Sequence, residues 1–268
     1  MLVLYFSGTG NTKYIAELFS AGMDAKCVSI EEAADFNAII KTHDRIAVCY
    51  PVYGSRVPLI MREFIARHMT ALKGKELVIF ATQVLFSGDG ARVLCDLFPE
   101  GHIKVIYAWH FLMPNNVNNF APLRKTGSKS IQKRIKIAEI KMARVCRDIN
   151  AGIERKRGFS ALAKMLGKIQ GIPWQGNSKN AFASGNTMEN RAKKSVRIDA
   201  DCTVCNICVE CCPMRNLENR QGAIVHNNNC TVCYRCVNLC PQKAITVFLK
   251  SKPKWQYEGT AQHLNITR

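Results

Sequence analysis

The strongest constraint in this sequence is a cysteine pattern that occurs twice. Nine of the thirteen cysteines lie between residues 202 and 240, and eight of them belong to two runs with the spacing C-x2-C-x2-C-x3-C-P. "VRIDADCTVCNICVECCP" and "IVHNNNCTVCYRCVNLCP" align without a gap, and their corresponding cysteines stand 28 residues apart. A duplicated module built around thiols holds either metal or disulfides, and metal is the better interpretation for a chain expected in a reducing compartment.

Each run has the ligand spacing of the iron–sulfur clusters in bacterial ferredoxins. Three thiolates two residues apart can wrap one face of a cubane within a single loop, whereas the fourth cysteine opens the next segment and points away. The resemblance to two-cluster ferredoxins implies that each cluster takes its fourth ligand from the other run. It assigns Cys202, Cys205, Cys208 and Cys240 to one [4Fe-4S] cluster, and Cys230, Cys233, Cys236 and Cys212 to the other.

Two alternatives stand beside this interpretation. Zinc ribbons also use C-x2-C pairs, but a zinc knuckle needs two cysteines rather than three, and both runs here end in Cys-Pro. Cys211 belongs to neither set of four. We interpret it as a small apolar filler beside a cluster, the alternative being a redox-sensing thiol.

The first 120 residues alternate short apolar runs with amphipathic segments. Strands are expected at 2–6, 26–30, 45–50, 76–82 and 103–111, and helices at 12–22, 58–69 and 91–98. Runs that are apolar on both faces indicate a parallel sheet covered by helices on both sides. Beyond them, we expect a basic amphipathic helix from Ser128 to about Arg157, a shorter helix at 159–169 and an irregular linker at 171–194.

The segment "SGTGNT" at 7–12 lies between the first strand and the first helix, where backbone N–H groups form an anion site. It lacks both the Gly-Lys-Ser/Thr ending of a nucleotide P-loop and the third glycine of the dinucleotide fingerprint. Its hydroxyl and amide side chains can donate to a terminal phosphate instead, and an ordinary capped turn is the alternative. The loops at 50–58 and 82–91 follow the third and fourth strands, so all three share the carboxyl edge where doubly wound sheets bind ligands.

With these loops in order, residues 1 to about 150 resemble a flavodoxin, and the whole chain resembles the flavodoxin–ferredoxin fusion proteins of the EFR-type family. The resemblance implies an α/β fold: a flavodoxin-like doubly wound five-stranded parallel sheet, with a small C-terminal α+β domain of the bacterial 2[4Fe-4S] ferredoxin type. It implies FMN in the first domain and two [4Fe-4S] clusters in the second. The expected divisions are 1–170, a linker at 171–194, a ferredoxin domain at 195–250 and a tail at 251–268.

The same resemblance implies FMN contacts from all three loops. They are Ser7, Thr9, Gly10, Asn11, Thr12, Pro51, Val52, Tyr53, Gly54, Thr82, Gln83, Phe86, Ser87, Gly88, Asp89 and Gly90. Tyr53 or Phe86 can cover an isoalloxazine face, and Gly54 allows a peptide flip that turns a carbonyl toward flavin N5. His110, at the end of the fifth strand, is a candidate proton donor to a substrate. Nothing resembles a Ser-His-Asp or Cys-His hydrolytic set.

The formal charge of +18 is concentrated in one stretch, since residues 121–200 hold 19 Lys and Arg against 5 Asp and Glu. A solvated helical face is the favoured interpretation, ahead of a nucleic-acid or membrane surface, and docking of an acidic redox partner is a third use. Phe159, Trp174 and Phe182 are too few aromatics for a base-stacking surface. No apolar run reaches the roughly 18 residues of a membrane span, and the N-terminus has no basic leader. We therefore expect a cytoplasmic protein.

Three functions are compatible with these features. The first is an electron-transfer flavoprotein that connects single-electron clusters with a flavin that carries one or two electrons. The alternative is a flavin-dependent reductase of a quinone, nitro compound or tetrapyrrole, and the third is a redox sensor acting through the basic stretch. No NAD(P)H site is evident in the sequence, so another redox protein is expected to supply the electrons.

Overall fold

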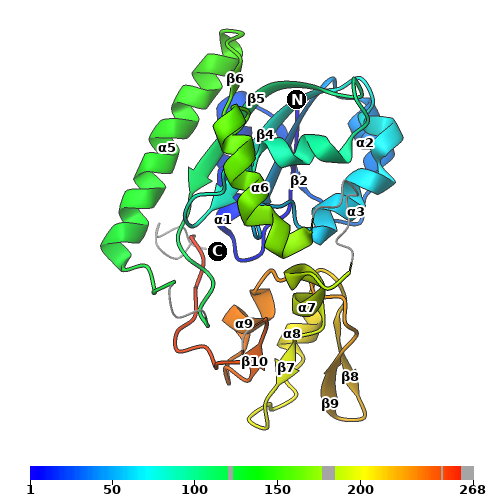
Figure 1. Cartoon of the computed structure of the whole chain (residues 1–268), viewed down its shortest axis with the longest axis vertical. Helices are drawn as coiled ribbons and strands as arrows, with labels where there is room; N and C mark the ends of the chain where they lie inside the picture. The colour runs from blue at the N-terminus through cyan, green and yellow to red at the C-terminus, as the bar shows by residue number, and fades with distance from the viewer. Residues whose placement is uncertain (120–122, 177–184, 249, 261–268) are drawn as a thin grey trace.

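The computed structural model describes residues 1–119, 123–176, 185–248 and 250–260. Figure 1 shows a layered larger part with a small part packed beneath it. The centre of the larger part is a parallel sheet with strand order β2-β1-β3-β4-β5-β6. Its strands are β1 (Leu2–Tyr5), β2 (Lys26–Ser29), β3 (Arg45–Pro51), β4 (Glu76–Gln83), β5 (Lys104–Leu112) and β6 (Arg155–Lys156). The order 2-1-3-4-5 is that of flavodoxin-like doubly wound sheets, so the predicted fold class is confirmed.

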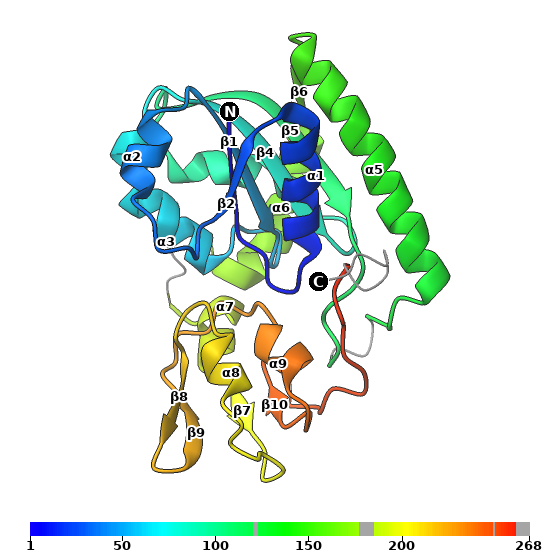
Figure 2. The same cartoon turned by 180° about the vertical axis from the view of Figure 1, so that it is seen from behind.

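Successive side chains along the strands point to opposite faces of the sheet and pack into two separate hydrophobic cores. In β1, Leu2 and Leu4 enter the core on one face of the sheet, whereas Val3 enters the core on the other, as the two-residue period of a strand requires. Helices cover both faces (Figures 1 and 2), with α1 and α5 together on the Val3 face. The helices of this part are α1 (Asn11–Met23), α2 (Phe36–Lys41), α3 (Leu59–Arg67), α4 (Met69–Leu72), the 3-10 helix η1 (Arg92–Leu97) and α5 (Ser128–Asn150).

The predicted count of five strands is wrong, because β6 adds a sixth. The helix expected to run to about Arg157 ends at Asn150, and the chain turns at Gly152, whose φ of +69° is left-handed. Asp148 then accepts a hydrogen bond from Arg155 Nε at 2.7 Å. Arg155 and Lys156 consequently pair in parallel with Tyr107 and Ala108 of β5.

The segment at 171–194 is not irregular throughout, in contrast to the prediction. Helix α6 (Ala161–Gln175) continues into it, and α7 (Met188–Lys193) lies near its end. Ser160 caps α6 by accepting from the N–H of Ala163. The segment expected as a helix at 91–98 forms the 3-10 helix η1.

The small part combines two short antiparallel sheets with two short helices. β7 (Arg197–Ile198) pairs with β10 (Ile245–Thr246), and β8 (Leu217–Arg220) pairs with β9 (Ala223–His226). Helices α8 (Ile207–Glu210) and α9 (Arg235–Leu239) stand 28 residues apart, as the cysteines do. The predicted small α+β unit is therefore present.

No helix among the described residues has the length and apolar character needed to cross a membrane.

Candidate functional site

Loops from four strands meet at the carboxyl edge of the sheet. The hydroxyls of Thr12 and Thr82 lie 2.7 Å apart and join the start of α1 to β4. Asn11 Nδ2 donates to the carbonyl of Pro114 at 2.9 Å, and Asn116 Nδ2 donates to Thr9 Oγ1 at 2.8 Å. The segment after β5 is thus a further wall of the site, which the sequence interpretation did not assign.

A small cavity of about 80 Å³ lies against the 7–12 loop. The hydroxyl-bearing Ser7, Thr9 and Thr12 line it, and α1 begins just below them without a side-chain cap. Gly10, at the N-cap of α1, has a left-handed φ of +96°, which favours glycine. Uncapped N–H groups in the first turn, together with these hydroxyls, fit a phosphate group.

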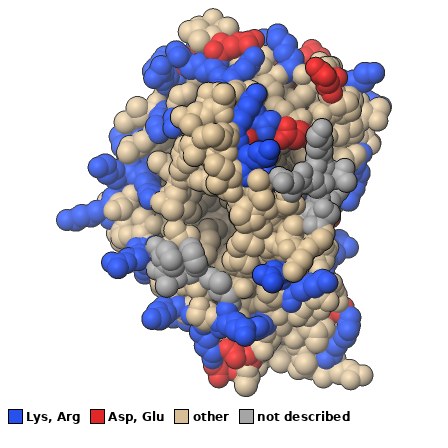
Figure 3. All heavy atoms as spheres, viewed as in Figure 1, with Lys and Arg blue, Asp and Glu red and all other residues tan. Residues whose placement is uncertain are grey.

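A larger cavity of about 440 Å³ adjoins the small one, and the two share the side chains of 52–53, 83–84 and 116–117. Its volume lies within the range of cofactor sites. Figure 3 shows a hollow on the face of the molecule that α6 crosses, bordered mainly by uncharged atoms. The cavity walls are mostly apolar and come from both parts of the chain: Val52, Tyr53, Gly54, Ser55, Gln83, Val84, Leu85, Phe86, Ser87, Asn116, Val117, Leu123, Gln170, Trp174, Met188, Val232, Tyr234 and Phe248.

Two residues of the 50–58 loop, Gly54 and Tyr53, form part of the wall of the large cavity. Gly54 has a φ of +55°, and a Cβ at this position would overlap the Trp174 side chain. Tyr53 Oη is buried with no hydrogen-bond partner among the described residues. Burial raises the pKa of Tyr53 well above its ordinary value, and the nearby Cys233 raises it further. A buried, unpaired hydroxyl beside a cavity is typical of a ligand-binding wall.

Most of the predicted flavin residues line these cavities, but four do not. Gly88 packs against Gly167 of α6, and Gly90 packs against the Ser87 side chain. Asp89 is buried and forms an ion pair with Arg92 at 2.7 Å. Gly88 therefore serves the close approach of α6, and Gly90 serves the packing of Ser87. Gly10 lines a third cavity, on the other side of the 7–12 loop.

His110, the candidate proton donor, lies away from the two cavities. Its Nε2 accepts a hydrogen bond from the N–H of Ala91 at 3.0 Å, and its ring lines neither of the two cavities. Burial, and then the positive charge of Arg157, lower the pKa of His110 to about 4. The ring is neutral at physiological pH and holds the 82–91 loop on β5.

Cysteines of both runs lie near one another in the small part. The pKa of the Cys208 thiol is raised to about 11, first by burial and then by its neighbours Cys202, Cys240 and Cys205. Cys240 is thus a neighbour of the first loop although it follows the second loop in sequence. The N–H of Ala244 donates to Cys240 Sγ at 3.3 Å.

In the second group, Cys212, Cys230, Cys233 and Cys236 line one small cavity. Burial raises the pKa of Cys236 well above its ordinary value, with Cys233 the next cause. The N–H of Val232 donates to Cys230 Sγ, and that of Asn216 donates to Cys212 Sγ, each at 3.2 Å. Backbone N–H groups directed at sulfur stabilise thiolates and tune cluster potentials.

The duplication extends to unusual backbone conformations. Val204 and Val232 have φ values of +53° and +61°, and Asn206 and Tyr234 have +64° and +60°. Such values are rare for non-glycine residues. Their recurrence at matching positions shows that both loops wrap in the same way.

Among the described residues, no three His, Cys, Asp or Glu side chains stand close enough to hold a single metal ion.

The second cysteine loop packs directly on the 7–12 loop. A Cβ added to Gly8 would lie 2.6 Å from the carbonyl oxygen of Cys233 and 3.1 Å from Tyr53 Oη. Arg235 donates to the carbonyls of Ser7 and Gly8, at 2.7 and 3.0 Å. It also forms a bidentate ion pair with Glu31, with both contacts at 2.8 Å. One guanidinium therefore fixes the cysteine loop to the loop suited to phosphate.

The chain returns to the same place after the cysteine repeat. Tyr257 is buried, and its hydroxyl donates to Asn11 Oδ1 at 2.6 Å. Its N–H donates to Asn238 Oδ1 at 2.7 Å. The tail at 256–260 thus lies over the 7–12 loop, with the α-carbon of Gly259 within 4 Å of the position of a Gly10 Cβ. The sequence analysis did not assign Tyr257 or Trp174 to the site. The available signal for each was a single aromatic residue in a polar segment.

Comparisons with known proteins concern the first half of the chain. The profile of the flavodoxin domain family matches residues 2–142. A flavodoxin from the domain Archaea shares 20% identity and covers 55% of this chain and 97% of its own, with a TM-score of 0.37. Two-electron reduced Megasphaera elsdenii flavodoxin shares 20% identity over 53% of this chain and 99% of its own, with a TM-score of 0.38. The flavodoxin, WrbA-like protein from Agrobacterium tumefaciens shares 19% identity over 56% of this chain and 97% of its own, with a TM-score of 0.39. No curated protein matches the chain.

Proposed function

Because the chain belongs to the flavodoxin domain family, we propose that its larger domain binds FMN and exchanges electrons with two [4Fe-4S] clusters in its cysteine repeat. FMN, when bound, supplies one- and two-electron chemistry, and the clusters supply single-electron chemistry. The chain is then an iron–sulfur flavoprotein that couples the two regimes.

The two adjoining cavities supply the residues for FMN. Thr9, Thr12 and the first turn of α1 hold the phosphate, and the apolar cavity beyond them holds the ring system. Trp174 and Tyr53 shape the wall of that cavity and exclude water from it.

Two sets of four cysteines supply the cluster ligands. Cys202, Cys205, Cys208 and Cys240 form one set, and Cys230, Cys233, Cys236 and Cys212 form the other, each set drawing on both runs. Four thiolates with backbone N–H donors at sulfur are the donor set that a [4Fe-4S] cluster requires.

One observation carries the proposal: the second cysteine loop is part of the flavin cavity. Val232 and Tyr234 line the large cavity, and the backbone of Cys233 abuts Gly8. The second set of cysteines therefore lies next to the flavin domain, and no diffusive encounter between two proteins is needed. Ligands Cys205 and Cys202 of the first set are exposed and half-buried, which suits entry of electrons from a partner.

A composition measurement tests the proposal. Anaerobically reconstituted protein should contain about eight iron, eight sulfide and one FMN per chain. After the clusters are reduced in a flash experiment, the flavin spectrum should change within the lifetime of the reduced clusters. Zinc in place of iron, or a flavin that stays oxidised, would overturn the proposal.

Matched cysteine variants test the crossed ligand sets. Cys212→Ala should damage the cluster of the second loop, whereas Cys211→Ala, at the adjacent position, should retain all the iron. Iron counts and low-temperature magnetic resonance spectra separate the two results. Equal damage in both variants would contradict the ligand assignment.

The apolar cavity favours a second candidate function, reduction of a small apolar acceptor such as a quinone. Its wall includes Leu85 and Phe86, which are also exposed at the molecular surface. Turnover of a soluble quinone by the reduced protein, with saturation and product formation, tests this candidate.

In either case we propose that another redox protein supplies the electrons and docks on the basic 121–200 segment. The rate at which that partner reduces this protein should therefore fall as the salt concentration rises.

A further inference from the structure

Helix α6 (Ala161–Gln175) presents three large apolar side chains to the outside of the molecule. Its buried residues are Gly167, Gly171 and Trp174. Leu162, Met165 and Ile169 lie on the opposite side at helical spacing and are 62%, 53% and 60% exposed. The helix is therefore amphipathic in the reverse sense to an ordinary surface helix, whose apolar stripe faces the core.

The inward glycines explain how the helix packs without Leu162, Met165 and Ile169. A Cβ at Gly167 would overlap the Asp89 carboxylate, and a Cβ at Gly171 would overlap the Arg56 guanidinium. Close backbone approach thus holds α6 on the 54–56 and 87–89 loops. The fold makes little use of Leu162, Met165 and Ile169, and large exposed apolar groups that gather in one place mark interaction sites.

The apolar surface continues onto the neighbouring loop. Gly88 packs against Ala163 and Gly167 of α6, so the residues just before it lie beside the helix. Leu85 and Phe86 in this loop are 63% and 53% exposed. They also line the large cavity, together with Gln170 of α6. We name Leu85, Phe86, Leu162, Met165 and Ile169 the α6 patch; it borders the mouth of the cavity.

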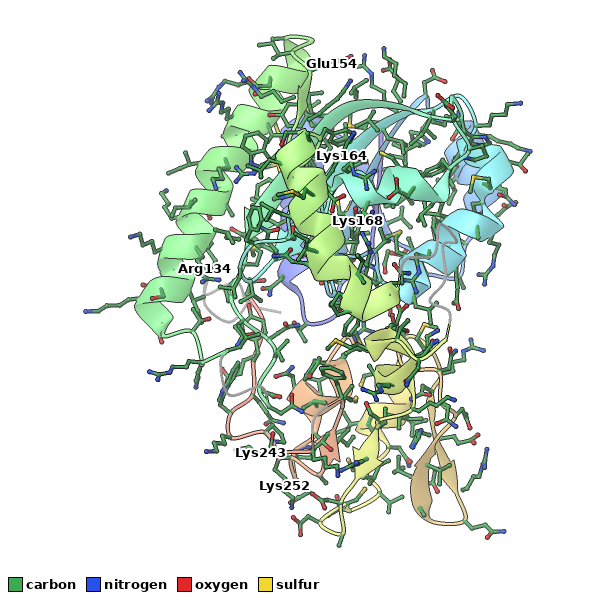
Figure 4. All side chains as sticks on the ribbon, in the orientation of Figure 1. Arg134, Glu154, Lys164, Lys168, Lys243 and Lys252 are labelled. Carbon is green, nitrogen blue, oxygen red and sulfur yellow. The ribbon has the colours of Figure 1, made fainter. Side chains whose placement is uncertain are left out.

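The chain segment that contains α6 carries charge of one sign. Residues 155–175 contain five Lys and Arg and no Asp or Glu. Lys164 and Lys168 stand on α6 itself (Figure 4), and both are exposed. An apolar helical face bordered by lysines is the pattern of helices that lie in the interface of a membrane with anionic lipids.

We propose that the α6 patch docks this protein on the surface of an anionic lipid bilayer, with the mouth of the large cavity facing the lipid. A second copy of the chain fits the patch less well, because two-fold pairing of α6 faces sets the lysines of one copy against those of the other. The proposal goes beyond electron transfer and requires neither cofactor.

Vesicle flotation of the full-length protein tests the proposal. We expect the protein to float with vesicles of phosphatidylcholine and phosphatidylserine, and to stay behind with phosphatidylcholine alone. The triple variant Leu162→Ser, Met165→Ser, Ile169→Ser should bind the anionic vesicles at least about tenfold more weakly. All three side chains are exposed, so its melting temperature should match that of the unchanged protein.

A pair of charge reversals provides the matched control. Lys168→Glu should weaken vesicle binding several-fold, whereas Lys243→Glu, which changes the charge equally on the small domain (Figure 4), should leave it unchanged. Three outcomes overturn the proposal: no binding to anionic vesicles, equal loss in both charge variants, or undiminished binding by the triple variant. Conversion of a dimer to a monomer by the triple variant, seen by sedimentation, assigns the patch to self-association and overturns it as well.

Discussion

Replacing Gly8 by alanine tests the contact between the cysteine loop and the 7–12 loop. The new Cβ would stand 2.6 Å from the carbonyl oxygen of Cys233, whereas ordinary contacts of this kind begin at 3.4 Å. Because both partners are backbone, neither can rotate away, and the two loops must separate by about 0.8 Å. The same movement stretches the hydrogen bond from Arg235 Nε to the Gly8 carbonyl beyond its present 3.0 Å.

Overpacking of this kind costs about 1–3 kcal/mol in the free energy of unfolding. For a chain of this size, such a loss corresponds to a fall in the melting temperature of roughly 2–12 °C. FMN affinity should fall in parallel, by about tenfold for each 1.4 kcal/mol that the displaced loop takes from binding. Thermal denaturation of the apo protein and fluorescence titration with FMN measure the two effects.

Gly127→Ala is the matched control, because nothing lies within 4 Å of its added Cβ and its φ of −68° suits alanine. Loss of a favoured N-cap residue and the lower conformational entropy of the unfolded chain oppose each other, so this variant should stay within about 0.5 kcal/mol of the unchanged protein. If Gly8→Ala melts and binds FMN as Gly127→Ala does, the two loops do not meet in solution and the reasoning fails.

Three further predictions concern groups around the site. Arg62 and Glu189 form a buried ion pair at 2.6 Å that joins α3 to α7. Arg62→Met should lower the free energy of unfolding, measured by urea denaturation, by about 3–5 kcal/mol, because it leaves a buried charge without its partner. Adding Glu189→Met should restore most of that loss. Tyr257→Phe removes the hydroxyl that donates to Asn11 and should weaken FMN binding about three- to tenfold in titrations, by the loss of about 1 kcal/mol; unchanged affinity would remove the tail from the site. The pKa of His110 is lowered to about 4 from an ordinary 6.5, so the unfolded chain binds the extra proton first and stability should be lost as pH falls from about 6.5 to 4. His110→Gln should flatten that slope in denaturation series across this range, and an unaltered slope would contradict the assignment.

The sequence predicts the sheet well because its central strands are short runs of apolar residues that only a sheet covered on both faces can bury. It does not predict β6, whose two basic residues pair with β5 because the chain turns at Gly152 rather than because of their composition. The repeat does predict that the two cysteine loops wrap alike, because their spacing is equal and their left-handed residues stand at matching positions.

The candidate site is less visible in the sequence where it depends on contacts between distant segments. Gly88 and Gly90 have the appearance of a ligand loop, but their small size serves the packing of α6 and of Ser87. Trp174, Phe248 and Tyr257 are single aromatics in polar surroundings, and no local pattern tells which cavity such a side chain enters. Their roles emerge only when the small domain is placed against the sheet edge.

The small domain is held to the flavodoxin domain both before and after its cysteine repeat, in addition to the Arg235 contacts within it. Before the cysteine repeat, Glu189 of α7 is anchored to Arg62; after it, Tyr257 is anchored to Asn11. An attachment at one end allows a domain to swing like an arm and meet its partner by collision, whereas attachments at both ends leave no hinge about which it can turn. The electron exchange that we propose for this chain should therefore follow a fixed path, with a rate that does not change with solvent viscosity.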